Sequence, residues 1–256
     1  MSDTGEDQRR GIQSVEVGHR LLDVLARGTG RRPLKDLAAE AGMAPSKAHL
    51  YLVSYQRLGL VEQDPVTARY SLGSAAIRLG VAAINQTDLV QVARRHIDDA
   101  VTRAGVSISL SIWGSHGPTV MLRRDGPQPF PISVRLGFVL PVLSSSTGRV
   151  FLSHLPESAW STLAQSEGAV RPDLLADLPD VLPKVRTQGF AITESFLHSG
   201  FFGVSAPIFN GEGMIEAAVT GLGLSAQSDL GNNGPVVTTI TDLARQISND
   251  LGACKT

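Results

Sequence analysis

The sequence contains one cysteine, Cys254, among 256 residues. A single thiol excludes an internal disulfide and a cysteine-rich zinc site. No apolar run approaches the roughly 18 residues that a membrane-spanning helix needs. The opening residues, MSDTGEDQRR, contain no apolar segment. We therefore expect a cytoplasmic protein without a signal peptide or membrane partner, and we interpret residues 1–10 as a disordered tail.

Motifs that indicate catalysis are also scarce. The stretch GVSAP (203–207) begins like the nucleophile elbow of hydrolases, but it lacks the second glycine and lies between two predicted strands. A glycine pair at 221–223 follows a strand without continuing into a phosphate-binding loop. The histidines are scattered without metal-ligand spacing: His19, His49, His96, His116, His154 and His198. We expect no catalytic residue, no metal and no cofactor, and thus not an enzyme.

The chain has enough apolar residues to fold, and its charge is unevenly distributed. Hydrophobic residues make up 42% and charged residues 18%, and the length favours two domains. Residues 9–78 carry 11 basic and 6 acidic side chains, whereas the residues after 80 carry 12 basic and 15 acidic ones. A basic first segment favours a polyanionic partner for that segment.

The first segment has the pattern of a winged helix-turn-helix. Apolar spacing predicts three helices, at 15–26, 34–41 and 45–58, followed by strands at 60–63 and 69–72. Gly42 closes the second helix, and Pro45 suits the first turn of the third. This order of elements predicts a DNA-binding domain over residues 11–73.

The remainder predicts a linker helix and an α+β domain. Residues 74–87 contain the linker helix (74–84), and residues 88–256 form the second domain. Apolar and small polar residues alternate at 106–112, as expected of a half-buried strand. Further strands are predicted at 119–124, 131–136, 190–193, 202–209 and 214–221, and helices at 89–104, 147–154, 157–165, 181–187 and 235–251. Antiparallel strands with helices clustered at their ends make an α+β fold.

These features resemble the IclR family of bacterial transcription regulators. The resemblance rests on the helix-turn-helix (34–59), the wing (60–73) and three later runs: LPVLSSSTGRVFLS (140–153), VRTQGFAITES (185–195) and GVSAPIFNGEGMIEAAVTGLG (203–223). It implies a GAF-like second domain that binds a small metabolite. It also implies a homodimer, or a dimer of dimers, on DNA.

The third helix of a winged helix-turn-helix presents its first turns to the major groove. Those turns carry Ser46, Lys47, His49 and Leu50, with Ser54 and Arg57 further along. Arg31, Arg32 and Arg69 suit phosphate contacts, which position a protein without reading sequence. The alternative is that these are solvated surface residues. Family members often carry arginine where Leu50 stands, so this chain has fewer charged contacts there.

The resemblance places an effector pocket on one face of the sheet. In the predicted strand 131–136, Ser133 and Arg135 share a face. The following run, with Ser145, Ser146 and Thr147, begins a helix whose free N–H groups favour an anion. The motif match adds Thr193, Gly203, Thr220 and Leu222. Alternatively, Arg135 faces solvent or a subunit contact, and the serine run is only a helix cap.

Relatives that bind small acids carry an acidic residue, a cysteine and serines at the later positions. The residues found here predict a roomier and less polar pocket, for a larger acid that is partly apolar or aromatic. The sequence therefore predicts a dimeric, ligand-responsive repressor that binds a palindromic operator and associates with the nucleoid. The alternative is a small-molecule enzyme or metabolite-binding protein with an incidental helical N-terminal domain.

Overall fold

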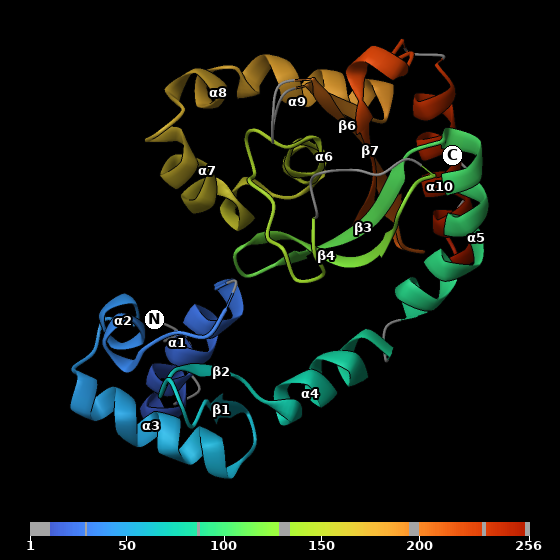
Figure 1. The fold of residues 1–256 in the computed structure, drawn as a ribbon. Coiled ribbons are helices and arrows are strands. Elements are labelled where there is room, and N and C mark those ends of the chain that lie inside the picture. Colours follow the sequence, from blue (N-terminus) through green and yellow to red (C-terminus); the bar gives the residue numbers. More distant parts are fainter. Residues whose placement is uncertain are drawn as a thin grey trace, which may run out of the picture. The chain divides into compact units, whose positions relative to one another are not determined.

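The computed structural model describes residues 11–28, 30–85, 88–127, 134–194, 200–231 and 234–253. The chain divides into two compact units, residues 1–84 and 85–256 (Figure 1). Each unit is built around its own apolar residues, so the two are described separately.

The first unit has the order of a winged helix-turn-helix. Its elements are α1 (Gln13–Arg27), α2 (Leu34–Glu40), α3 (Pro45–Arg57), β1 (Val61–Gln63), β2 (Tyr70–Leu72) and α4 (Ser74–Asn85). The boundaries lie within one residue of those predicted, except that α1 starts two residues earlier. Fraying of helix ends accounts for shifts of this size.

The turn between α2 and α3 sets the direction of α3. Gly42 has φ of +65°, which an L side chain rarely adopts, and Met43 N donates to the carbonyl of Ala38 at 3.0 Å. From α3, Ala48 and Leu52 are buried against Leu21 and Leu37. Because helix residues three or four apart share a face, the opposite side of α3 points outward.

The wing is a two-stranded hairpin fixed by its own turn. The carboxylate of Asp64 accepts from the amides of Val66 (3.0 Å) and Thr67 (2.8 Å). These bonds, chiefly the one from Thr67, lower the pKa of Asp64. The backbone of Arg32 pairs with Tyr70 of β2, which ties the loop before α2 to the wing.

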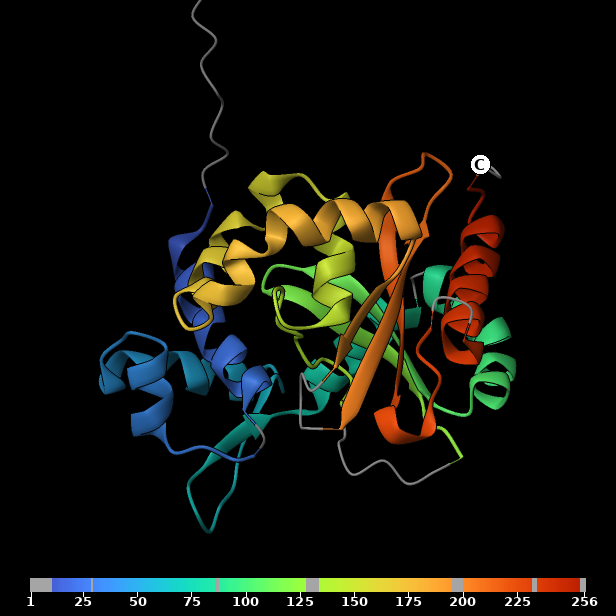
Figure 2. The same cartoon turned by 90° about the horizontal axis from the view of Figure 1, so that it is seen from above.

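The second unit contains an antiparallel sheet in the order β4-β3-β7-β6-β5. Its strands are β3 (Ser107–Gly114), β4 (Gly117–Arg124), β5 (Ala191–Glu194), β6 (Phe201–Phe209) and β7 (Ile215–Leu224). The helices α5 (Asp88–Ala104) and α10 (Pro235–Asp250) pack together on one face. On the other face lie α6 (Ser146–His154), α7 (Ser161–Gly168), α8 (Pro172–Ala176) and α9 (Leu178–Gln188), as Figure 2 shows.

The strand register brings small polar residues together on the α6 face. Ser109 of β3 stands opposite Thr220 of β7, and Thr220 stands opposite Ser205 of β6. The next row contains Leu222, Gly203 and Thr193. Because alternate residues point to one face, these side chains all lie under α6.

Three predicted elements differ in the structure. The predicted strand 131–136 is wrong in its described part, since residues 134–136 lead into a turn at Gly137 (φ +78°). After that turn the chain runs along β4, where Val120 N donates to Phe138 O (3.0 Å). The helix α9 begins three residues earlier than predicted, and the predicted helix 157–165 is split into a 3-10 turn (Glu157–Ala159) and α7. The short helix α8 was not predicted.

Two further features bear on the class of protein. Among the helices that the structure describes, none is both long and apolar enough to cross a membrane. In the same described ranges, no three His, Cys, Asp or Glu side chains lie close enough together to hold a metal ion.

Candidate DNA-binding face and effector pocket

The outer face of α3 is polar and open to solvent. Exposed side chains from its first two turns are Ser46, Lys47, His49 and Leu50, and Ser54 and Arg57 continue the face. Leu50 keeps 69% of its surface exposed although it is large and apolar. The helix sequence, PSKAHLYLVSYQR, contains no acidic residue. This face therefore combines cationic, hydroxyl and apolar groups on a helix of the size that fits a major groove.

The three arginines predicted to contact phosphate differ in their surroundings. Arg69 is exposed at the wing. Arg31 contacts the carboxylate of Asp64. Arg32 contacts Glu40, with Nη1 and Oε2 2.8 Å apart, and this bond lowers the pKa of Glu40. Arg31 and Arg32 thus already contact carboxylates within their own unit, whereas the side chain of Arg69 is exposed at the wing.

A small pocket lies between α6 and the sheet. It is lined by Ser109, Val134, Leu140, Ser145, Ser146, Thr147, Thr193, Gly203, Thr220 and Leu222. The structure therefore brings together seven of the nine residues predicted for the effector. They come from the start of α6 and from β5, β6 and β7, which are far apart in the sequence.

The floor of the pocket is a network of hydroxyl groups. Ser205, fully buried, lies 2.8 Å from Ser146 Oγ and 2.7 Å from Thr220 Oγ1. Thr220 Oγ1 in turn lies 2.8 Å from Thr147 Oγ1. Each hydroxyl can donate once and accept twice, so the members satisfy one another without a ligand.

The pocket in this structure is smaller than predicted, whereas the less polar lining stays a prediction. The space between the lining side chains holds about one water molecule. There is no free space beside Gly203 for a side chain, because a Cβ there would lie 2.8 Å from Ser146 Oγ. The hydroxyls of Thr193 and Thr220 are bonded within the protein, with Thr193 Oγ1 accepting from Ser146 N at 3.2 Å and Thr220 Oγ1 2.8 Å from Thr147 Oγ1.

The expectation of free N–H groups at the start of α6 is also wrong. The Glu167 carboxylate of α7 accepts from the amides of Val142 (2.7 Å), Leu143 (3.0 Å) and Ser144 (3.0 Å), and from Ser144 Oγ (2.7 Å). Within the helix, Ser145 Oγ caps Gly148 N at 2.9 Å. Glu167 thus takes the amides of the segment before α6, Ser146 N of the first turn donates to Thr193 Oγ1, and the serine run acts as a cap.

Two predicted effector residues, Arg135 and Ser133, are not among the seven that line the pocket. Arg135 is exposed and does not line the pocket. Its predicted inward orientation is wrong because residues 134–136 are not a strand, so the alternation of faces does not apply. Ser133 lies outside the described residues.

Four residues of the site were missed by sequence reasoning. Val134 and Leu140 flank the turn at Gly137, and no periodicity marks them. Ser109 belongs to the alternating run 106–112, whose small polar residues share a face with Thr220. Ser205 drew attention only as a possible nucleophile, and its hydroxyl instead binds Ser146 and Thr220. The signal that could have identified Ser109 and Ser205 was the recurrence of small residues at every second position of their strands.

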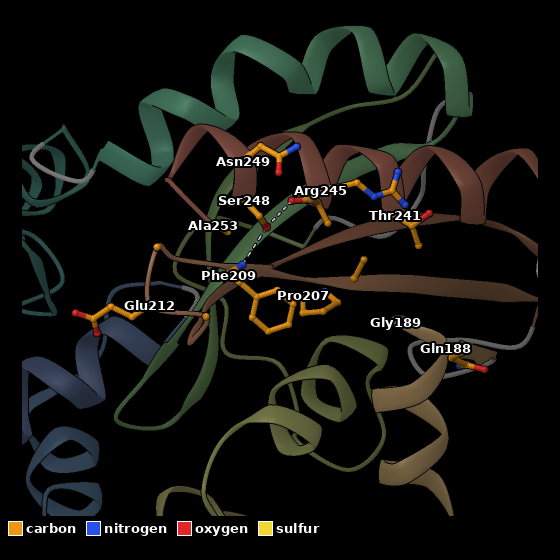
Figure 3. Close-up of a pocket in the computed structure, with 14 residues that line it drawn as sticks. Gln188, Gly189, Pro207, Phe209, Glu212, Thr241, Arg245, Ser248, Asn249 and Ala253 are labelled. Carbon is orange, nitrogen blue, oxygen red and sulfur yellow. Dashed lines mark hydrogen bonds between the residues drawn. The ribbon is translucent and has the colours of Figure 1, made fainter. Parts of the chain in front are cut away.

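A second, larger cavity lies beside the free part of β6. β5 pairs only with residues 202–205 of β6, and beyond that pairing Ala206, Pro207 and Phe209 line a groove of about 780 Å³ that is open to solvent. Figure 3 shows Arg245 and Thr241 of α10 near Pro207 and Phe209 of β6. Phe209 N donates to Ser248 Oγ at 3.0 Å. None of the predicted effector residues lines this groove.

Comparison with known families agrees with this division of the chain. Residues 14–65 match the family described as "IclR helix-turn-helix domain". Residues 81–249 match the one described as "Bacterial transcriptional regulator IclR C-terminal". Together the two matches cover most of both units.

Individual relatives agree as well. The chain is 30% identical to the Glycerol operon regulatory protein of Streptomyces coelicolor over 252 residues, 95% of this chain and 98% of that protein. The crystal structure of Pseudomonas aeruginosa HmgR matches at 32% identity and a TM-score of 0.61, covering 96% and 100% of the two chains. An IclR homolog complexed with 4-hydroxybenzoate, from Microbacterium hydrocarbonoxydans, has the same fold at 20% identity, 93% and 98% coverage and a TM-score of 0.75. Further relatives are named as transcriptional repressors.

A winged helix-turn-helix followed by a ligand-binding α+β domain defines a one-component transcription regulator. The chain belongs to the IclR family of bacterial transcription regulators. It is accordingly a DNA-binding regulator with an effector-binding C-terminal domain, and not an enzyme.

Proposed function

We propose that this regulator is a homodimeric repressor that leaves a palindromic operator when an organic acid occupies the pocket beneath α6. The exposed, acid-free face of α3 carries this proposal. Residues 11–73 bind DNA, residues 74–87 link the domains and residues 88–256 bind the effector. The protein acts in the cytoplasm, on DNA of the nucleoid.

The α3 face divides its work between bases and phosphates. Lys47 reaches guanine acceptors or phosphate, Ser46 and His49 bond base edges or backbone, and Leu50 packs on a thymine methyl. Arg57 and Arg69 contact phosphates on either side. The exposure of all these side chains supports the assignment. Arg31 and Arg32 also contact phosphate, but Arg31 stays paired with Asp64 and Arg32 with Glu40.

The effector binds among Ser145, Ser146, Thr147, Thr193, Gly203, Thr220 and Leu222. The hydroxyl groups recognise polar atoms, and Val134, Leu140 and Leu222 contact an apolar or aromatic body. The IclR homolog that holds 4-hydroxybenzoate supports an aromatic acid as the first probe. Because the pocket holds about one water molecule, the effector enters only when the pocket opens.

The apolar surface of α4 supports a dimer. Ile77, Leu79 and Val81 keep 64%, 63% and 51% of their surfaces exposed on one short helix. Ile77 and Val81 lie one turn apart on the same side of α4, with Leu79 on the opposite side, and exposed apolar side chains gathered on a short helix mark a protein interface. A two-fold dimer through α4 presents two copies of α3 to two half-sites of a palindrome.

The deciding experiment measures DNA binding against salt. Fluorescence anisotropy of the full chain with the DNA upstream of its own gene is compared with random DNA of equal length, from 50 to 300 mM salt. We expect specific binding at nanomolar concentration, at least about a thousandfold tighter than random binding. Addition of 4-hydroxybenzoate and of other aromatic and aliphatic acids is expected to weaken only the specific binding.

The alternative, an enzyme or metabolite-binding protein with an incidental helical domain, gives a different result. It predicts weak binding that is equal on both DNAs and falls steeply with salt. That outcome would refute the proposed function. A thermal-shift screen with the same acids tests the effector half independently, because a ligand selective for the folded chain raises its melting temperature.

A further inference from the structure

Arg123 lies beside the pocket under α6, although no sequence pattern marked it. It stands directly opposite Ser109 in the β3–β4 register, and Ser109 lines the pocket. Residues opposite each other in an antiparallel pair project from the same face. The next residue, Arg124, projects from the other face, where its Nε donates to Asp98 of α5 at 2.8 Å. Arg123 therefore belongs to the α6 face.

The guanidinium of Arg123 contacts the pocket wall directly. Nη1 donates to the carbonyl oxygen of Val134, a lining residue, at 2.8 Å. Nε donates to the carboxylate of Asp125 at 2.8 Å. Only 14% of the Arg123 side chain is exposed, whereas 77% of the Asp125 side chain is exposed. A mostly buried cation is thus held by a neutral carbonyl on one side and by a solvated carboxylate on the other.

A carboxylate that enters this pocket needs such a cation. The ten lining residues are hydroxyl, apolar or glycine residues, and burying an anion among them without a counter-charge is costly. The amides before α6 are taken by Glu167. Arg135, predicted for this role, is exposed elsewhere.

We infer that Arg123 binds the carboxylate of the effector, in exchange for the carbonyl of Val134. This inference rests on the proposed function, in which an organic acid occupies the pocket. The exchange is favourable because a planar guanidinium forms two parallel, charge-assisted bonds to a carboxylate but only a single bond to a carbonyl.

The same exchange opens the pocket. Residues 134–140 form its wall along β4, where Gly137 N donates to Val120 O (2.8 Å) and Leu140 N to Pro118 O (2.7 Å). Arg123 holds the far end of this wall through Val134. Release of Val134 frees the wall and the cation together, so an acid that displaces the carbonyl also gains the space that it needs.

The test compares three arginine variants and matched ligand pairs. Arg123→Gln removes the cation at the pocket, Arg124→Gln removes the neighbouring cation on the opposite face, and Arg245→Gln removes the one beside the β6 groove. Calorimetric titration of the full chain uses carboxylates paired with their amides, beginning with benzoate and benzamide. We expect Arg123→Gln to lose at least about tenfold in carboxylate affinity and to leave amide affinity unchanged. The other two variants should match the wild-type chain.

Other outcomes overturn the inference in distinguishable ways. Equal loss of carboxylate and amide binding in Arg123→Gln assigns it a purely structural role. Loss in Arg245→Gln instead moves the anion to the β6 groove. Selective release of operator by neutral compounds removes the carboxylate from the mechanism but leaves the proposed regulator intact. If no compound changes operator binding, the effector half of the proposed function fails as well.

A gain-of-function variant guards against a folding failure in Arg123→Gln. Asp125→Asn alters an exposed side chain and removes the competing carboxylate from Arg123. Carboxylate affinity is expected to rise several-fold in this variant, with amide affinity constant. Unchanged or weaker carboxylate binding in a folded Asp125→Asn chain would contradict the inference.

Discussion

The outer face of α3 and the floor of the α6 pocket are built from similar side chains in opposite states. On α3, Ser46 and Lys47 are exposed and face solvent. In the pocket, Ser146, Ser205 and Thr220 are buried and bonded to one another. The outer face of α3 is therefore open for a partner to bind, whereas the pocket hydroxyls already form hydrogen bonds with one another.

Because of this difference, substitutions on the α3 face can change DNA binding without changing stability, whereas substitutions in the α6 pocket change both binding and stability. A solvated side chain contributes little to the folded state, so changing it affects only the bound complex. A buried hydroxyl network contributes to folding, and a ligand must compete with it. Substitutions should therefore have one measurable effect on α3 and two effects at the pocket.

The largest expected effect comes from removing the hydrogen bonds that Glu167 accepts from the segment before α6. Glu167→Ala leaves three backbone amides and the Ser144 hydroxyl without their acceptor, and should lower the free energy of unfolding by about 2–4 kcal/mol. Urea denaturation measures the change, with the exposed Glu212→Ala as its control. Acetate should restore part of the loss in Glu167→Ala alone. Equal denaturation midpoints for the two variants would rule out this role of Glu167.

The next effect is confined to DNA. Lys47→Ala should weaken operator binding by about 1–3 kcal/mol if Lys47 contacts a base, with little change in unfolding free energy. Anisotropy titrations on operator and random DNA measure it, and Lys184→Ala, exposed on α9, is the control. An equal loss on both DNAs would reduce Lys47 to a phosphate contact.

A smaller effect tests the coupling of stability and binding in the pocket. Thr220→Val keeps the shape of the side chain but removes the hydroxyl that bonds Thr147 and Ser205. We expect a loss of about 1 kcal/mol in unfolding free energy and a changed effector affinity. Thr238→Val, on the exposed side of α10, should change neither quantity. A Thr220→Val chain that loses stability but keeps its effector affinity, or the reverse, would contradict the expected coupling.

The smallest effect concerns pH. Burial lowers the pKa of His154, which lies edge-on to Phe209, and the charge of Arg186 lowers it further. The folded chain therefore binds fewer protons than the unfolded chain as the pH falls through about 6.5. Stability should be complete above that pH and decline below it. Denaturation at several pH values should give a shallower decline for His154→Asn than for His19→Asn, whose histidine is exposed; equal slopes would exclude His154 as the source.

Sequence patterns predicted the parts of the pocket that follow a period. Thr193, Gly203 and Thr220 lie on strands whose alternation fixes the face, and Ser146 and Thr147 begin a helix after a serine run. The path of residues 134–140 was not predictable in this way. It depends on backbone bonds to β4, which leave no trace in the order of side chains.

The two arginines show the same limit. Arg135 alternates with apolar residues, whereas Arg123 is followed directly by Arg124, and the sequence alone favoured Arg135. Only the pairing of β4 with β3, which sets Arg123 opposite Ser109, reveals which one faces the pocket. Glu167 carried no local signal either, since its partners lie 23 to 25 residues away.

The short reach of β5 has a consequence for how copies of this protein associate. At the uncovered end of β6, Pro207 has no N–H, and the N–H of Phe209 is already bonded to Ser248. A strand added along residues 206–209 would therefore find no free donor at these two positions, so this part of β6 disfavours strand addition.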